Sequence, residues 1–501
     1  MATIIERIKK RKILIVTIAL FLVLFFGAFM RLWQLGYSSY WLDEGFTLMQ
    51  ARSIAAHGYP LLDSGYVEWK DLLMPYLIAP LIKIFSFEHP GVLRLWSAIF
   101  GISSILIGYH LAVRIFSYYT GLLFAFFIAS CHWYIAWSQQ ARGYSAVIFF
   151  TLLFFYFLSK YEHNINAKWL SYAFLSIIFA VLAKKFSIIL FVPFLFYFLG
   201  KKLYRAFLVF GVPSSLVVVY FIIKMWHILT INPLTYFGFY VKEYLFSYFG
   251  IFAILGLFGV VIAFGSSQKY KIFHASVVVF MISTIATFSL LVFVSERRYL
   301  IMITPFLFLY TAYFIEYISL KVGHKIMIGG LLFIFIVISS GVYDYSTILV
   351  PRKHYALEQY TPQPNYKKVY EKIIQDGFNE EDIIVSTNPL FDIIYLGRSD
   401  YAIPWSLTGR EGDTTFIGDY EIYSGAKKLK GNDGTVGIGK IKKIQKESDV
   451  YVIMDSLASR RMEFDLWDDI TDIGEEIFSD GEEHFIIVYK FSKIAQNEGA
   501  D

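Results

Sequence analysis

Long apolar runs that carry almost no charge constrain this chain more than any other feature. The first, from Ile13 to Met30, contains no charged residue. A helix needs about 20 apolar residues to cross the hydrocarbon core of a bilayer. By length and flanking charge we expect eleven spans, near 13–32, 92–113, 119–137, 143–159, 169–183, 186–200, 205–223, 245–264, 272–294, 299–318 and 326–343.

Composition supports a polytopic membrane protein and excludes several other classes. Hydrophobic residues make up 57% of the 501 residues and charged residues only 17%, which is too little charge for the surface of a soluble protein of this length. The net charge of +5 is not gathered in a basic tail or helix face, so we expect no nucleic-acid partner. The single cysteine, Cys131, lies in an apolar run, which excludes a disulfide framework and a cysteine zinc site.

Basic residues in the loops favour one topology. The N-terminus, with five basic residues between Arg7 and Lys12, should stay in the cytoplasm, and the first span lacks a cleavage site and should remain as an anchor. With eleven spans, the inner loops after residue 87 hold ten basic residues and the outer loops seven. A twelfth span at 72–87 would reverse this, but Pro75, Pro80 and Lys83 make that segment a better interfacial or re-entrant piece.

The character of the chain changes after about residue 344, where charges become frequent. Helical periodicity predicts a helix from Tyr366 to Gln375. The runs Asp382–Thr387 and Asp449–Asp455 are typical of buried parallel strands, and Glu483–Ser492 of a closing strand. We therefore expect a membrane domain at 1–343, with a first outer loop at 33–91, and an outer α/β domain at 344–501.

This C-terminal domain shows no catalytic motif of its own. It has no GxGxxG sequence and no P-loop, and Gly434, Gly437 and Gly439 fit a turn or loop better than a phosphate cradle.

Two adjacent acids, Asp43 and Glu44, follow the first span on the predicted outer side. On their own they are typical of solvated loop charges, or of an N-cap and first-turn acid of a helix from Phe46 onward. A catalytic pair is the alternative that the rest of the chain supports. The outer arginines Arg142, Arg297 and Arg298 run against the usual charge bias, as interface anchors or as partners of an anionic ligand.

Together these residue types suit group transfer from a lipid phosphate to a hydroxyl. A carboxylate can take the proton from the acceptor hydroxyl, and arginine or lysine can neutralise the departing phosphate. Because that phosphate leaves as a stable anion, no general acid is required. Tyr37, Tyr40 and Trp41 offer flat faces for a sugar ring, or belong to an interfacial aromatic belt.

Four short motifs, in order and on one predicted side, resemble the C-type (GT-C) integral membrane glycosyltransferases of the protein O-mannosyltransferase and aminoarabinose transferase kind. They are Trp41-Leu42-Asp43-Glu44-Gly45, Arg94-Leu95-Trp96-Ser97, Ser138-Gln139-Gln140-Ala141-Arg142-Gly143-Tyr144, and Arg298-Tyr299-Leu300 with Pro305-Phe306.

The resemblance implies an inverting glycosyltransferase with its active site on the outer face of the plasma membrane. It implies a polyprenyl-phosphate sugar donor, a lipid, glycan or protein acceptor, and mannose as the commonest sugar. Asp43 matches the acceptor-activating base and Glu44 its catalytic neighbour. The donor-phosphate ligands would be Lys70, Arg94, Arg142, Arg297 and Arg298, and the sugar-stacking residues Tyr40 and Trp41. Many relatives carry an acid where this chain has Gln140, which argues against a second carboxylate or a metal role at this position. Since some relatives bind a divalent metal and others do not, we expect no cofactor and no metal.

Two other classes remain as alternatives. A transporter of a lipid-linked sugar or anion would show internal repeats and charges near the bilayer midplane, whereas this chain shows no clear repeat and its charges lie at span ends. A receptor or assembly scaffold would leave Asp43 dispensable.

Overall fold

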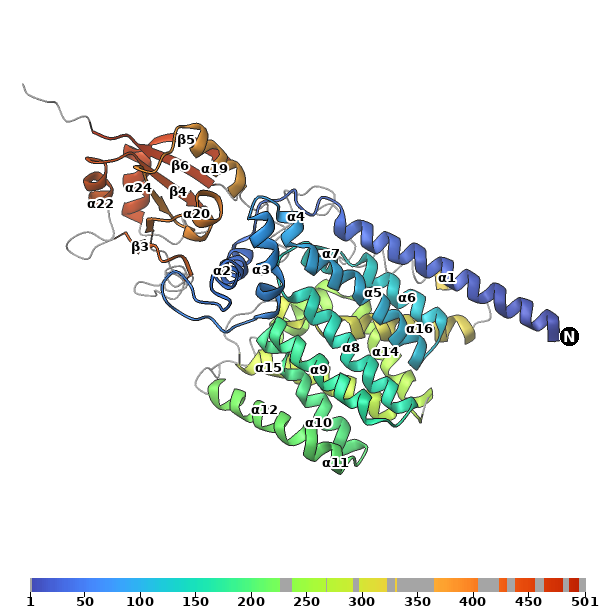
Figure 1. Cartoon of the computed structure of the whole chain (residues 1–501). Helices are drawn as coiled ribbons and strands as arrows, with labels where there is room; N and C mark the ends of the chain where they lie inside the picture. Colours follow the sequence, from blue (N-terminus) through green and yellow to red (C-terminus); the bar gives the residue numbers. More distant parts are fainter. Residues whose placement is uncertain are drawn as a thin grey trace, which may run out of the picture. The chain divides into compact units, whose positions relative to one another are not determined.

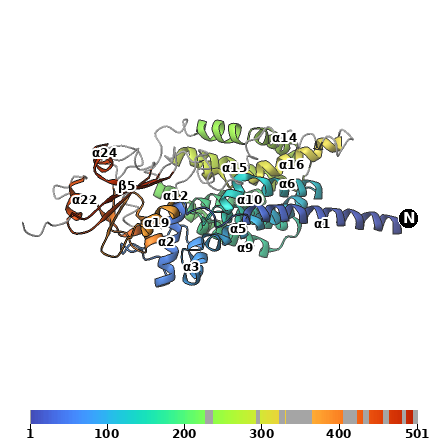
Figure 2. The same ribbon diagram turned by 90° about the horizontal axis from the view of Figure 1, so that it is seen from above.

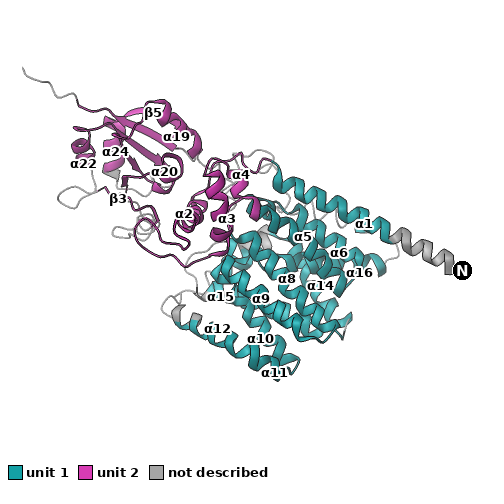
Figure 3. Ribbon diagram, in the orientation of Figure 1, with its two compact units in different colours: residues 1–33, 97–139, 143–345 teal, residues 34–96, 140–142, 346–501 magenta. Residues whose placement is uncertain are grey.

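The computed structural model describes residues 2–225, 237–266, 268–291, 297–321, 329–330, 365–403, 423–429, 438–455, 464–480 and 486–494. The chain divides into two compact units, coloured in Figure 3. Unit 1 comprises residues 1–33, 97–139 and 143–345, and unit 2 comprises residues 34–96, 140–142 and 346–501. The first loop is thus grouped with the C-terminal region.

Unit 1 is helical throughout its described part (Figures 1 and 2). Its helices are α1 (Ala2–Leu32), α5 (Leu95–Ile115), α6 (Tyr118–Ser130), α7 (His132–Ser138), α8 (Tyr144–His163), α9 (Ala167–Ala183), η1 (Lys185–Leu190), α10 (Phe191–Gly200), α11 (Tyr204–Ala206), η2 (Phe207–Gly211), α12 (Val212–Met225), η4 (Phe239–Tyr248), α14 (Ile251–Ser266), α15 (Lys271–Leu291), η5 (Arg297–Leu300) and α16 (Thr304–Lys321).

Helices lie at the first ten expected spans, alone or as consecutive short pieces. Within the described residues, four helices (α1, α5, α8 and α15) are long and apolar enough to cross a membrane. The pair α6 and α7, bent by 60°, makes a fifth if it counts as one span. Apart from Gly329 and Gly330, the expected span 326–343 lies outside the described residues. The chain therefore has a mainly helical fold with membrane-type spans, and eleven stays a prediction.

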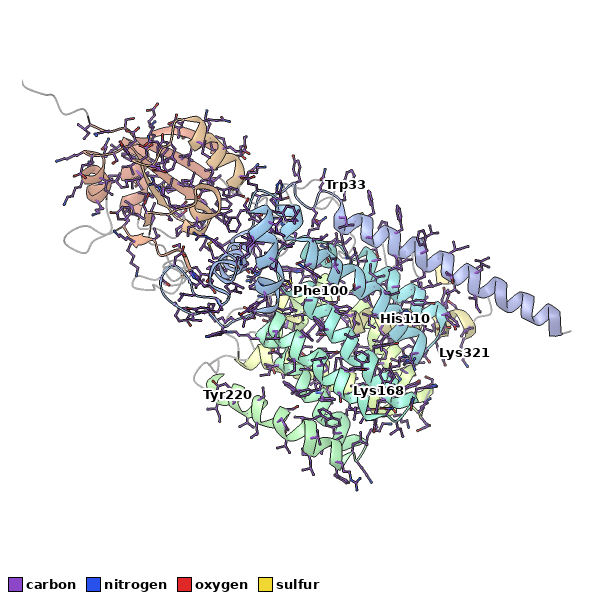
Figure 4. All side chains as sticks on the ribbon, in the orientation of Figure 1. Trp33, Phe100, His110, Lys168, Tyr220 and Lys321 are labelled. Atoms are coloured by element: carbon purple, nitrogen blue, oxygen red, sulfur yellow. The ribbon has the colours of Figure 1, made fainter. Side chains whose placement is uncertain are left out.

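Close helix contacts in unit 1 depend on small residues. A Cβ at Gly259 of α14 would clash with the Tyr310 carbonyl of α16, so glycine lets these two helices approach closely. Gly101 of α5 faces Ser138 of α7 and the Arg31 side chain in the same way. Figure 4 labels Phe100 and His110 on α5, where the side chains of this bundle gather.

The end of α1 is anchored by a buried arginine. Arg31 is fully buried, and its guanidinium donates hydrogen bonds to the carbonyls of Gly27, Ile128 and Ala129 at 2.9–3.0 Å. Since Ile128 and Ala129 lie in the last turn of α6, Arg31 satisfies carbonyls that the helix itself leaves unpaired. It thereby fixes the point at which the chain leaves unit 1.

Unit 2 contains α2 (Leu42–His57), α3 (Leu73–Phe85) and α4 (Pro90–Leu93) of the first loop, and an α/β fold built from residues after 364. The latter's elements are α19 (Tyr366–Gln375), β1 (Ile383–Ser386), α20 (Pro389–Leu396), β2 (Tyr401–Ala402), β3 (Lys427–Lys428), α22 (Ile438–Ile444), β4 (Val450–Asp455), α24 (Phe464–Ile473), β5 (Glu475–Asp480) and β6 (Ile486–Phe491). The sheet order is β3-β2-β1-β4-β6-β5.

The expected elements of this α/β fold are confirmed. The helix α19 has the predicted bounds, and β1 pairs with β4 in parallel, with Ile383 opposite Val450. The closing strand β6 runs antiparallel to β4, and the fully buried β4 forms the centre of the sheet. Gly439, which we expected in a loop, lies in α22, while Gly434 and Gly437 fall outside the described residues.

The segment predicted to be interfacial forms α3, a 13-residue helix that contains Pro80 and packs against α2. It is too short to count among the spans.

Candidate active site at the start of helix α2

The site begins where α2 begins. Trp41 has an extended backbone (φ −85°, ψ 155°), and its carbonyl accepts the first helical bonds from the amides of Glu44 and Gly45. The Glu44 carboxylate reaches back to accept a hydrogen bond from the Trp41 amide at 2.8 Å. Acids are favoured in a first helical turn, where backbone N–H groups lack partners. The interpretation of Glu44 as a first-turn acid is therefore correct.

Glu44 is fully buried, and both of its oxygens are occupied by protein donors. Arg94 forms a bidentate pair with it, from Nε to Oε1 and from Nη2 to Oε2, each at 2.8 Å. The Ala141 amide also donates to Oε1 at 2.7 Å. With the bond from Trp41, four donors meet a carboxylate that has about four acceptor positions. Such a carboxylate has no room to accept a proton from a substrate.

All N–H groups of Arg94 are likewise used in hydrogen bonds within the protein. Besides Glu44, its terminal nitrogens donate to the carbonyls of Leu35, Ser38 and Ser39 at 2.9–3.1 Å, which accounts for all five N–H groups of a guanidinium. The side chain is fully buried. The structure thus replaces two predicted roles: Arg94 is not placed to bind a donor phosphate, and Glu44 is not placed to react. Together they hold the turn 35–41 against the start of α2.

Asp43 has a different environment from its neighbour. Its side chain is 18% exposed, and its Oδ2 lies 3.2 Å from Nη2 of Arg142, which is 13% exposed. Arg142 also donates to the Asp43 carbonyl at 2.6 Å and to Oγ1 of Thr47 at 3.0 Å. These three contacts fix the guanidinium beside the carboxylate. The structure therefore brings Asp43 and Arg142 together, and adds Thr47, a contact that no motif in the sequence indicated.

Gln140 precedes this arginine by two residues. It is fully buried, and among the described residues neither its amide nitrogen nor its amide oxygen has a hydrogen-bond partner. Buried polar groups rarely lack a hydrogen-bond partner. Across the described ranges, no three His, Cys, Asp or Glu side chains gather as metal ligands would.

Lys70 lies near the same helix by way of the loop between α2 and α3. Its side chain is 55% exposed, and its Nζ lies 3.3 Å from Oε2 of Glu68, which is buried. The side chain of Gln50 on α2 donates to the Lys70 carbonyl at 3.0 Å. The Lys70 ammonium is thus both partly exposed and paired with a buried carboxylate, and its role toward a phosphate stays a prediction.

The predicted aromatic residues differ in exposure. Tyr40 is 1% exposed: its hydroxyl donates to the Phe87 carbonyl at 2.8 Å, and its ring lies 5.3 Å from the Arg94 guanidinium. Burial raises the pKa of this hydroxyl well above its usual value, so it stays a neutral donor. Tyr40 therefore packs the turn and offers no open face to a sugar. Trp41 is half-buried and keeps its predicted role as an expectation.

Arg297 and Arg298 lie in unit 1, where they open the short helix η5 ahead of α16. Arg298 is half-buried. Their role toward a phosphate remains a prediction.

Part of the chain matches a known family in sequence. Residues 70–229, which include Lys70 and Arg142, match the model of the dolichyl-phosphate-mannose-protein mannosyltransferase family. No curated protein matches the chain in sequence.

Solved structures match over almost the whole chain. ArnT from Cupriavidus metallidurans bound to undecaprenyl phosphate has a TM-score of 0.58 at 12% identity, covering 98% of this chain and 99% of that one. The archaeal oligosaccharyltransferase AglB from Archaeoglobus fulgidus, in complex with an inhibitory peptide and a dolichol-phosphate, has a TM-score of 0.56 at 13% identity, covering 96% and 75%. The chain therefore has the fold of the C-type integral membrane glycosyltransferases, and the resemblance predicted from its sequence is confirmed.

Proposed function

We propose that this protein is an inverting glycosyltransferase that moves a sugar from a polyprenyl-phosphate donor to a hydroxyl of a lipid, glycan or protein acceptor. Two similarities support the lipid donor. The matching family is named for dolichyl-phosphate mannose, and the similar structures hold undecaprenyl phosphate and dolichol-phosphate. A hexose or pentose is the sugar we expect, and we expect no metal to take part.

The observation that carries this proposal is the Asp43–Arg142 pair at the first turn of α2. Unlike Glu44, Asp43 has a partly exposed carboxylate. Arg142 orients this carboxylate with one contact to its side chain and another to its carbonyl. An oriented carboxylate beside a fixed cation is the arrangement needed to take a proton next to a departing anion.

The reaction follows from these groups. Asp43 accepts the proton of the acceptor hydroxyl as its oxygen bonds to the anomeric carbon of the sugar. The bond from that carbon to the phosphate oxygen breaks on the opposite face, so the configuration inverts and the polyprenyl phosphate leaves as an anion. Lys70 and Arg142 supply positive charge to that phosphate.

We propose the topology that the loop charges favour. Eleven spans, with α3 in the membrane interface, put Asp43 and the C-terminal domain outside the plasma membrane. A sugar on a polyprenyl lipid facing outward would meet both Asp43 and the acceptor there.

The test measures the transfer of labelled sugar from the host's own lipid-linked sugars. It does not require the identity of the sugar to be known beforehand. Polyprenyl-phosphate sugars are extracted after metabolic labelling and added to membranes that contain the wild type or Asp43→Asn. Wild type should transfer label, and Asp43→Asn should lose on the order of 100-fold in rate, as removal of a positioned base does. Glu371→Gln, which changes an exposed acid on α19, is the matched control. Turnover of Asp43→Asn near the wild-type rate would remove Asp43 from this role.

A further inference from the structure

A hydrogen bond joins the first loop to a tyrosine 355 residues further along the chain. The Tyr423 hydroxyl donates to Oε2 of Glu68 at 3.0 Å. Glu68 is only 3% exposed, and Tyr423 is 9% exposed. A buried carboxylate needs such partners, because leaving it without donors would cost the full desolvation of its charge.

The same carboxylate holds Lys70 from two directions. Its Oε1 accepts a hydrogen bond from the Lys70 amide at 3.0 Å, and its Oε2 lies 3.3 Å from the Lys70 ammonium. Gln50 fixes the Lys70 carbonyl from α2. Both the backbone and the ammonium of Lys70 are therefore positioned by their neighbours, although most of the side chain is exposed.

Residues of the C-terminal region also contact α2 itself. The Tyr423 ring meets Phe46 edge-on, with ring centroids 4.8 Å apart. Leu390 of α20 packs against Gly45, where an added Cβ would lie only 3.3 Å from a Leu390 methyl carbon. Phe46 and Gly45 follow Asp43 and Glu44 in the first turns of the helix. The C-terminal region thus touches both the helix that carries Asp43 and the carboxylate that holds Lys70.

We infer that the C-terminal domain completes the phosphate-binding part of the site, with Tyr423 as a positioning residue that acts through Glu68 on Lys70. The inference rests on the proposed function, in which Lys70 meets the donor phosphate. A lysine side chain is long and flexible, so an ammonium already held in place loses less freedom when it binds. The domain therefore contributes to donor binding without contacting the donor.

A double-mutant cycle on the full-length protein tests this. The measurement is the dissociation constant of undecaprenyl phosphate, used as the probe, for detergent-solubilised wild type, Tyr423→Phe, Lys70→Ala and the double variant. Tyr423→Phe should weaken binding about 5-fold alone, because a hydrogen bond to a charged group is lost, and less than 2-fold in the Lys70→Ala background. Tyr451→Phe is the matched control, since this tyrosine also donates to a carboxylate, Asp376 at 2.9 Å, but within the α/β fold.

The outcomes separate the inference from the proposed function. If the wild type does not bind the probe, both the proposed function and the inference fail. If the wild type binds it and Lys70→Ala binds it equally well, Lys70 does not meet the phosphate, and the inference fails while the role of Asp43 stands. If Lys70→Ala weakens binding but Tyr423→Phe does not, or does so equally in both backgrounds, only the inference is overturned. Should Tyr423→Phe fold poorly, the cycle is run with Glu68→Gln, which removes the charge through which Tyr423 would act on Lys70. An equal effect of Glu68→Gln with and without Lys70 would then overturn the inference.

Discussion

Exchanging each of the two adjacent acids for its amide should separate stability from catalysis. Glu44→Gln removes the charge from a fully buried carboxylate and leaves the Arg94 guanidinium without a counter-ion. Breaking a buried ion pair in this way costs about 3–5 kcal/mol. Asp43→Asn changes a partly exposed group, and the bond from Arg142 to the Asp43 carbonyl does not depend on the side chain. It should cost less than Glu44→Gln, because water screens a partly exposed pair more than a fully buried one.

Arg94→Met extends the comparison to the other partner. It leaves the Glu44 charge buried and removes the donors of three backbone carbonyls, at Leu35, Ser38 and Ser39. The loss of three hydrogen bonds to a charged donor adds about 1 kcal/mol or more each to the cost of the lost ion pair. The sum approaches the whole stability of a typical domain, about 5–15 kcal/mol, so we expect little folded protein.

The assay measures two quantities on each detergent-solubilised variant. One is the fraction that survives graded heating as monodisperse protein in gel filtration, and the other is the transfer rate per folded molecule. We expect Glu44→Gln to lose thermal stability and to keep much of its rate per folded molecule. Asp43→Asn should keep its thermal stability and lose most of its transfer rate per folded molecule. If Glu44→Gln were as stable as the wild type and inactive, Glu44 would be a reacting group, and the assignment made from its four hydrogen bonds would be wrong.

Three further predictions concern other parts of the molecule. Gln140→Met should keep or raise thermal stability, because no hydrogen bond of the amide is lost; a large loss would reveal a partner for this side chain. Burial raises the pKa of Asp392 to about 7, so the folded state favours the protonated form, and the stability that this form provides is present at low pH and lost as the pH rises through about 7. Asp392→Asn should therefore lose less thermal stability than the wild type between pH 5 and pH 8, and equal losses would contradict the shift. In a Cys131→Ser background, Ser295→Cys should react with a membrane-impermeant thiol reagent on intact cells and Ser266→Cys should not; the opposite pattern would reverse the proposed topology.

Local signals predicted much of the fold. The helix Tyr366–Gln375 has one apolar face, and the run Val450–Asp455 is buried throughout, so each pattern indicated its element directly. The short strands β2 and β3 were not predicted. Each has two residues and exists because it pairs with a distant neighbour, Tyr401 with Val385 and Lys427 with Tyr401. A strand of two residues is too short to show the alternation of apolar and polar residues by which a strand is predicted.

The candidate site was predicted as a set of residues but not as a set of roles. A helix advances by about 100° per residue, so two adjacent acids point in different directions. Arg94 follows Glu44 by 50 residues, so the tertiary fold decides which of the two acids it meets. A resemblance carried by short motifs identified Asp43, Glu44, Arg94 and Arg142 together, and only tertiary contacts separate the buried pair from the partly exposed one.

The buried acids explain how the partly exposed groups are held. Oε1 of Glu44 accepts the Ala141 amide, and the next residue is Arg142, which pairs with Asp43. The charge of Glu44 therefore helps to set the position of the cation beside the proposed base. Glu68 has the same relation to Lys70, since it binds both the amide and the ammonium of that residue. In each case a buried carboxylate holds a residue whose cation is more exposed. Since preorganised charge is worth most when it need not move during the reaction, a loss of Glu68 should reduce donor binding even where the protein still folds.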